Sequence, residues 1–309
     1  MVGPAVAPGR STGVAGRRAA GDHGFVPHAT TRRRVVRVAV DDAGAHPRPA
    51  RPDTLAVEEP LELRIGTPGS EPAPWTTTMR TPGHDLDLAL GFLVAEGVVS
   101  SAAHVLAARH CPDASRDEDG EPTYNVVEVV LARGVPLPDP ARHRSMTSAC
   151  GICGTTTIDA VRTASAFDVA ADDVRLDPAV VAGLPDRLRA AQRVFDSTGG
   201  LHAAGLFTPA GDLVAARADV GRHNAVDKVV GHAASALGLP LAGHVLQVSG
   251  RASFELVQKA AMAGCPVLAA VSAPSSLAVE LAEEAGITLV GFSRGTGFNV
   301  YSRSDRLGL

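Results

Sequence analysis

Between residues 202 and 301 the sequence alternates short apolar segments with stretches of helical period, and this restricts the fold more than any other feature. The predicted strands are apolar on both faces, as in a sheet covered by helices on each side. Asp177-Pro178 predicts a helix start, with Asp as the cap and Pro in the first turn, and that helix runs to about residue 195. The predicted strands lie at 202–208, 213–218, 245–249, 267–272, 287–292 and 298–301, and helices at 224–237, 253–263 and 275–285. A hairpin that leads into βαβαβ units predicts a three-layer α/β domain over residues 145–309.

The sequence pattern of the first half predicts a smaller α+β domain over residues 31–144. Strands are expected at 35–40, 61–65 and 124–131, and a helix after Pro82-Gly83-His84-Asp85 that ends at Gly97. Residues 1–30 contain six Gly and three Pro and have no apolar period, so a disordered tail is predicted there.

Polar and glycine-rich residues follow the predicted strands at 219–224, 249–253, 272–276 and 291–297. Ligands of open α/β sheets bind outside the carboxyl ends of the strands. Small residues, hydroxyls and arginines near helix N-termini are typical of phosphate sites, so we predict an anionic, nucleotide-like ligand. The candidate binding residues are Arg222, His223, Ser249, Arg251, Ser275, Phe292, Ser293, Arg294, Gly295, Thr296 and Gly297, and the segment 292–297 is the strongest of them.

Cys150-Gly151-Ile152-Cys153 is the sharpest local motif. As half a zinc site it lacks a second pair, because Cys111 and Cys265 have no partner at ligand spacing. A deaminase site would need a proline before the first cysteine and an upstream His-x-Glu, and neither is present. Thiol chemistry requires only access and flexibility, which Gly151, Gly154 and the polar run 144–148 supply. We therefore predict sulfur chemistry at this pair, no metal site, and no required role for Cys111 or Cys265.

Several charged and histidine side chains are expected to have structural roles. Asp227 and Lys228 are predicted to form a solvent-exposed pair, and Glu255 and Lys259 an i,i+4 pair on one helix. His202 is expected to face its strand neighbours.

Composition excludes several classes of function. With 45% hydrophobic and 20% charged residues the chain is globular, and a net charge of -4 favours neither nucleic acid nor membrane. Aromatic residues make up 4%, which is too few to supply base-stacking platforms. The uncharged stretch 260–279 is broken by Gly264, Pro266 and Pro274, so no membrane span is expected. Four cysteines and the absence of a signal-peptide core predict the cytoplasm.

Taken together, several motifs resemble those of the formate dehydrogenase accessory sulfurtransferase family (FdhD-like). They are Ser148 to Gly154, Asp219 to Gly231, Ser249-Gly250-Arg251 with Phe254-Glu255, Gly291 to Gly295, Met79 to Asp85, and Glu58 to Leu61. One departure is Arg217-Ala218, where the family commonly has an acidic residue.

The resemblance implies a cytidine-deaminase-like fold without zinc ligands for the second half, and a homodimer. It also implies a sulfurtransferase in which Cys150 carries a persulfide received from a cysteine desulfurase and Cys153 assists. The cargo is then the molybdenum bis(guanine dinucleotide) cofactor, to be inserted into the formate dehydrogenase catalytic subunit, with no cofactor permanently bound. The candidate residues at the sheet edge would hold its guanine nucleotide ends.

Two other functions stay open. The chain could be a non-catalytic chaperone that binds the cofactor and uses its thiols as a redox switch. A thioredoxin-like oxidoreductase is disfavoured, because the Cys pair lies between the two halves rather than at a strand-to-helix turn.

Overall fold

The computed structural model describes residues 29–116, 120–138, 165–192 and 198–309. A six-stranded sheet forms the centre of the second half, in the order β10-β9-β11-β12-β13-β14. The strands are β9 (His202–Phe207), β10 (Leu213–Asp219), β11 (Val245–Val248), β12 (Val267–Ala270), β13 (Thr288–Arg294) and β14 (Gly297–Ser302). β11, β12 and β13 are parallel, whereas β9 runs antiparallel to β11, and β14 antiparallel to β13.

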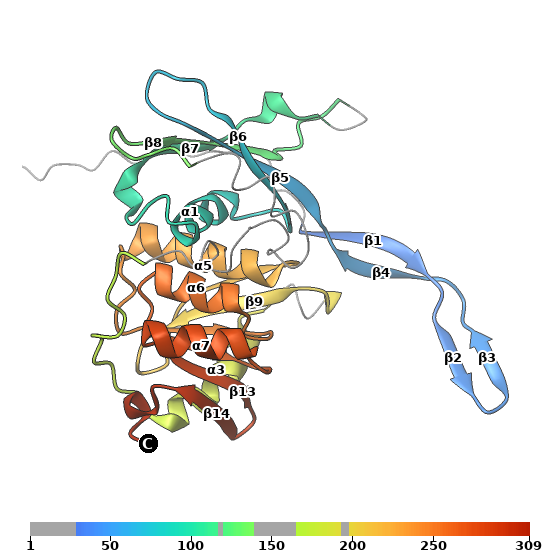
Figure 1. Cartoon of the computed structure of the whole chain (residues 1–309). Helices are drawn as coiled ribbons and strands as arrows, with labels where there is room; N and C mark the ends of the chain where they lie inside the picture. Colours follow the sequence, from blue (N-terminus) through green and yellow to red (C-terminus); the bar gives the residue numbers. More distant parts are fainter. Residues whose placement is uncertain (1–28, 117–119, 139–164, 193–197) are drawn as a thin grey trace, which may run out of the picture.

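Helices cover both faces of this sheet (Figure 1). α3 (Pro178–Ala190) packs on one face, where Val181 joins a core cluster with Val245 and Val267. The opposite face is covered by α5 (Arg222–Ala236), α6 (Phe254–Met262) and α7 (Ser276–Ala285). Leu246 and Leu268, each one residue further along β11 and β12, point to that face and belong to its core cluster. The side chain of Asp177 accepts a hydrogen bond from the backbone N–H of Ala179, as its predicted capping role requires. The predicted three layers are therefore present, although α3 ends at Ala190 and not near residue 195.

The first half contains a four-stranded sheet in the order β6-β5-β8-β7. Its strands are β5 (Glu59–Gly66), β6 (Ala73–Arg80), β7 (Val105–His110) and β8 (Val126–Leu131), and α1 (Asp85–Ala95) lies between this sheet and α5. β6 and β7 were not predicted, since neither shows a regular apolar alternation. Short 3-10 turns occur at Ala102–His104, Pro112–Ala114 and Ser304–Leu307.

A ribbon of four short strands precedes this sheet and projects from the body (Figure 1). β1 (Thr30–Val35) pairs with β4 (Arg51–Ala56), and β2 (Val38–Asp41) pairs with β3 (Gly44–Pro47). The prediction of one strand over 35–40 was wrong, because β1 ends at Val35 and β2 begins at Val38. Thr30, placed in the tail by the sequence, is the first residue of β1.

One hydrophobic core runs through both halves. Leu61 and Leu88 from the first half belong to the same buried cluster as Val229 and Leu246 from the second. α1 and α5 approach so closely at Gly91 and Gly231 that a Cβ at either glycine would overlap the backbone of the other helix. The boundary predicted between 144 and 145 therefore does not separate two cores. No helix in the described part of the chain has both the length and the apolar character of a membrane span.

Candidate functional site

The loops that follow β11, β12 and β13 meet at one edge of the six-stranded sheet. Backbone hydrogen bonds join them in series, since Ser272 N donates to Gly250 O at 3.2 Å and Phe292 N donates to Ser272 O at 3.2 Å. His202 lies at the same edge, because β9 is antiparallel to β11 and begins where β11 ends. The side-chain oxygen of Ser249 accepts a hydrogen bond from Ala203 N at 2.9 Å, which ties β9 to the loop after β11.

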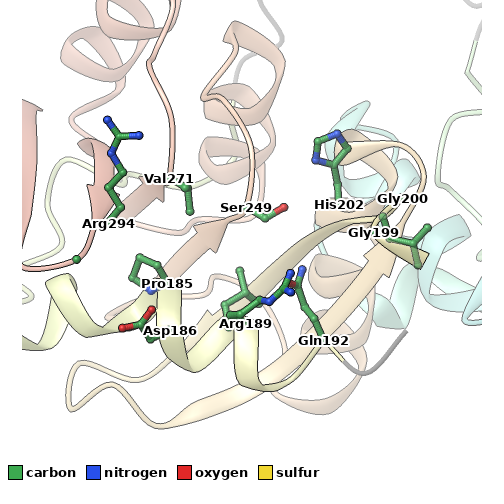
Figure 2. Close-up of a pocket in the computed structure, with 13 residues that line it drawn as sticks. Pro185, Asp186, Arg189, Gln192, Gly199, Gly200, His202, Ser249, Val271 and Arg294 are labelled. Atoms are coloured by element: carbon green, nitrogen blue, oxygen red, sulfur yellow. The ribbon is translucent and has the colours of Figure 1, made fainter. Parts of the chain in front are cut away.

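A cavity of about 500 Å³ opens between this edge and the C-terminal part of α3. Figure 2 shows Arg189 and Gln192 rising from the end of α3, with Ser249 and His202 opposite them. The described residues that line it are Pro185, Asp186, Leu188, Arg189, Gln192, Gly199, Gly200, Leu201, His202, Ser249, Val271, Arg294 and Gly295. Its volume is within the range of small-molecule sites, about 300–1,000 Å³.

Polar groups without protein partners lie in and beside the cavity. Gln192 is 7% exposed, and its side-chain nitrogen has no hydrogen-bond partner in the described structure. Nε of Arg222 is likewise buried and unpartnered. The guanidinium group of Arg294 makes no hydrogen bond or ion pair within the described residues, and the residue is exposed. Buried polar groups nearly always have a partner, so the buried nitrogens of Gln192 and Arg222 are available to donate to a ligand with acceptor oxygens.

Three of the predicted binding residues, Ser249, Arg294 and Gly295, line the cavity. The other predicted residues do not. Ser275 caps α7 by accepting from Ala278 N at 3.2 Å, and Arg251 is exposed on the loop before α6. The segment predicted as a loop over 291–297 is instead a hairpin, in which Gly295 and Thr296 connect β13 to β14. Ser293 is fully buried and Phe292 is exposed with a positive φ of 52°.

A second group of side chains surrounds the start of α5. Nε2 of His223 lies 3.2 Å from Oγ of Ser253 and 3.6 Å from a carboxylate oxygen of Glu255. Burial alone would raise the pKa of Glu255, but hydrogen bonds from His223, Ser253 and the backbone outweigh it and lower the pKa to about 2. Burial lowers the pKa of His202, and the nearby charges of Arg222 and His223 lower it further. Neutral His202 can therefore either accept or donate a hydrogen bond at the cavity wall.

The loop at 219–224 was predicted to bind an anion, but two of its polar side chains, Asp219 and Asn224, bind the chain itself. Asp219 accepts hydrogen bonds from the backbone N–H groups of Thr81 and Gly221, at 3.1 and 2.9 Å. Nζ of Lys228 lies 2.6 Å from Asp219 and donates to Thr81 O at 2.8 Å. Asn224 donates to Met79 O at 2.7 Å. This motif therefore joins the two halves of the protein.

The prediction that Asp227 and Lys228 form a solvent-exposed pair was wrong, and Lys259 pairs with Asp227 instead of with Glu255. Lys228 pairs with Asp219, whereas Asp227 is buried and its two carboxylate oxygens accept from Nζ of Lys259, at 2.8 and 2.9 Å. Arg217 donates from Nε and Nη2 to Asp87 of α1. Each of these ion pairs joins two different helices or strands, and the spacing of residues in the sequence does not reveal such partners.

Cys150 and Cys153 lie outside the described residues. Cys265 is fully buried, and burial raises the pKa of its thiol to about 12. Burial and Glu128 raise the pKa of Cys111. The described residues contain no group of three or more His, Cys, Asp or Glu that could hold a metal ion.

Sequence reasoning missed the whole α3 wall of the cavity and also His202. The helix was predicted, but its register against the sheet was not. A signal for His202 was available, because a hairpin before the first parallel strand brings the start of β9 to the ligand-binding edge.

Comparisons with known proteins agree with this fold. The sequence model of the FdhD/NarQ family matches residues 56–308. The chain is 56% identical over 285 residues to the sulfur carrier protein FdhD of Streptomyces avermitilis, covering 91% of this chain and 96% of that protein. It is 51% identical over 284 residues to the sulfur carrier protein FdhD of Mycobacterium tuberculosis, covering 91% and 99%. A crystal structure of a putative formate dehydrogenase accessory protein from Desulfotalea psychrophila has a similar fold, with a TM-score of 0.65, 22% identity, and coverage of 89% and 99%.

Proposed function

The chain belongs to the FdhD/NarQ family, and from that membership we propose that it is a sulfur carrier in formate dehydrogenase maturation. In the finer form of the proposal it is a sulfurtransferase. The Cys150 thiolate attacks the sulfane sulfur of a cysteine desulfurase persulfide, forms a new S–S bond, and releases the desulfurase thiolate. Cys153 assists by exchange, because its thiolate attacks the inner sulfur of the Cys150 persulfide, forms a Cys150–Cys153 disulfide and releases the terminal sulfur as sulfide. The molybdenum bis(guanine dinucleotide) cofactor receives this sulfide before its insertion into the dehydrogenase.

We place the guanine nucleotide part of that cargo in the cavity at the sheet edge. The observation that carries this assignment is the unpartnered nitrogen of buried Gln192 in the cavity wall. Gln192 can donate to a base carbonyl or phosphate oxygen, and Arg294 supplies a guanidinium fork for phosphate. His202 and Ser249 provide further polar atoms at the wall.

We also propose that the second half is a cytidine-deaminase-like domain. The order of its elements is consistent with this, since a helix and a hairpin precede alternating helices and strands, and β9 is antiparallel to the parallel strands β11, β12 and β13. A homodimer and a cytoplasmic location stay predictions from the family resemblance and the sequence.

Sulfur loading tests the carrier role directly. The purified chain is incubated with a cysteine desulfurase and L-cysteine, separated from both, and treated with cyanide, and the thiocyanate released is measured. We expect about one equivalent from the wild type, as one persulfide per chain requires, and none from Cys150→Ala. Cys265→Ala is the matched control and should keep full loading. Absence of cyanide-labile sulfur from the wild type, with nucleotide binding retained, would favour the non-catalytic chaperone.

Nucleotide binding tests the cavity. Loss of a charge-assisted hydrogen bond costs about 1.5–3 kcal/mol, so Arg294→Ala should weaken guanosine diphosphate binding about tenfold or more in calorimetry. Gln192→Leu should weaken it as well, while Arg175→Ala, in the segment before the opposite end of α3, should not. If both cavity variants bind guanosine diphosphate with unchanged affinity and melt at a lower temperature, Arg294 and Gln192 have a structural role and do not bind the nucleotide.

A further inference from the structure

Two side chains in the wall of the cavity present hydrogen-bond donors that the protein itself does not use. The side-chain nitrogen of Gln192 is buried and has no partner in the described structure. Oγ of Ser249 accepts a hydrogen bond from Ala203 N at 2.9 Å, and within the described residues its own hydrogen has no acceptor. We call Gln192 and Ser249 the donor pair, because a ligand that meets both receives an N–H and an O–H.

Side chains that could only accept a hydrogen bond are scarce in the same wall. Asp186 is the one carboxylate among the described lining residues; it is exposed and lies toward the end of the cavity that Arg294 occupies (Figure 2). Gln247 in β11 has an unpartnered side-chain oxygen, but it is fully buried and does not line the cavity. His202 can accept or donate, so it selects neither kind of ligand edge. A ligand edge that faces the donor pair must therefore present acceptors.

The two ends of the cavity suit different parts of a nucleotide. Figure 2 shows Gln192 and Arg294 at opposite ends, with Ser249 between them. Leu188, four residues before Gln192, is a buried lining residue, so a phosphate at that end would lose its hydration beside apolar side chains. Arg189, drawn beside Gln192, already interacts with another group of the protein, whereas the guanidinium of Arg294 is exposed and unpaired within the described residues. The base therefore belongs at the donor pair and the phosphates at Arg294.

Purine bases differ at the edge that carries N7. Guanine has two acceptors there, O6 and N7, whereas adenine has the acceptor N7 and the donating 6-amino group. The 2-amino group of guanine lies on the opposite edge of the base pair, away from O6 and N7. A wall that offers only donors to the N7 edge pairs with a 6-oxopurine and leaves the amino hydrogens of adenine facing other donors.

We propose that Gln192 and Ser249 select a 6-oxopurine base by donating to its O6 and N7 edge, and that the 2-amino group of guanine is not read. Inosine and guanosine nucleotides then bind alike, and adenosine nucleotides are rejected. Arg294 binds the phosphates of every nucleotide and has no part in the choice of base. This inference rests on the proposed nucleotide site and adds how that site selects its base.

Calorimetry of the full chain with guanosine, inosine and adenosine diphosphate tests the proposal. Guanosine and inosine diphosphate should have similar dissociation constants, and adenosine diphosphate should bind about tenfold or more weakly. Gln192→Glu replaces the donor by an acceptor of nearly the same shape. The ratio of the adenosine to the guanosine diphosphate dissociation constant should therefore fall toward one. Gln192→Leu removes the donor without adding a charge and should lower the same ratio.

Arg294→Ala is the matched control, because it should weaken all three nucleotides by the same factor and leave that ratio unchanged. Circular dichroism melting determines that each variant is folded. Adenosine diphosphate that binds as tightly as guanosine diphosphate, or inosine diphosphate that binds about tenfold more weakly than guanosine diphosphate, would overturn the base selection and leave the nucleotide site in place. A ratio unchanged by both Gln192 variants would also overturn it. If the wild type binds none of the three nucleotides, the nucleotide site itself is wrong, and the base selection with it.

Discussion

Nζ of Lys228 on α5 lies 2.6 Å from a carboxylate oxygen of Asp219 at the end of β10, and both side chains are almost completely buried, at 1% and 0% exposed. Lys228 also donates to the backbone oxygen of Thr81, and Asp219 accepts from its backbone nitrogen. The ion pair therefore holds the segment before α1 against the second half of the chain.

We expect Lys228→Met to lower the free energy of unfolding by about 3–5 kcal/mol, because it leaves a buried carboxylate without its cation. The measurement is urea unfolding followed by circular dichroism. Arg175→Met is the control, since Arg175 is exposed and 3.9 Å from Asp305, and should cost less than about 1 kcal/mol. Equal losses in the free energy of unfolding from the two variants would show that the buried pair contributes no more to stability than the exposed one.

Substitution by alanine should have opposite effects on stability at two helical glycines, Gly91 at the crossing of α1 and α5 and Gly183 on α3. A Cβ at Gly91 would overlap the backbone carbonyl of Asp227, so Gly91→Ala should destabilise the protein by about 3 kcal/mol or more. In α3 the nearest atom to a Cβ at Gly183 is Nε of Arg187 at 3.9 Å. Gly183→Ala should therefore stabilise the helix by about 0.5–1 kcal/mol. Thermal melting measures both, and a stable Gly91→Ala variant would contradict the close approach.

Acid should remove stability that Glu255 provides. Its pKa is lowered from 4.5 to about 2 in the folded protein, so its contribution is complete above pH 4.5 and is lost as the pH falls toward 2. Because the site is half-buried and screened by solvent, we expect Glu255→Gln to remove about 1–2 kcal/mol of this pH dependence. Urea unfolding at a series of pH values measures it.

His223→Phe should remove only part of the pH dependence that Glu255→Gln removes, because the hydrogen bonds from Ser253 and the backbone to Glu255 remain. The double variant should then lose no more than Glu255→Gln alone. Additive losses would mean that the two side chains act independently.

Cys265 should be chemically inert in the folded protein. The thiolate is the reactive form of cysteine, and a pKa of about 12 leaves almost none of it near neutral pH. Iodoacetamide should therefore leave Cys265 unmodified in native protein and alkylate it after unfolding in urea, as peptide mass spectrometry can determine. Alkylation of Cys265 at the rate of half-buried Cys111, with no loss of fold, would contradict this assignment.

The arrangement of predicted strands and helices in the second half is confirmed because it depends on neighbouring residues. Apolar residues repeat with the period of a strand or a helix, and caps such as Asp177 and Ser275 bond within three residues of themselves. The position of the ligand-binding edge also follows from the order of the strands. Ser249 and Arg294 were therefore placed correctly at one cavity, although their role in binding stays a prediction.

The split of the 35–40 strand and the hairpin over 291–297 were not predictable in this way. Val35 to Val40 reads as one strand by alternation, and only the pairing of β1 with β4 and of β2 with β3 shows where it breaks. The wall formed by Gln192 was missed for a similar reason, since the register of α3 on the sheet depends on packing.

By itself the sequence determined the helices and strands of the second half, the edge of the sheet at which the cavity lies, and the family resemblance. Only the tertiary structure decided that Asp219, Asn224 and Lys228 join the two halves. The physical reason is distance along the chain, because Lys228 meets Thr81 across 147 residues. The partner of a charged side chain at such a separation is set by the packing of α1 on α5, and no local pattern encodes it.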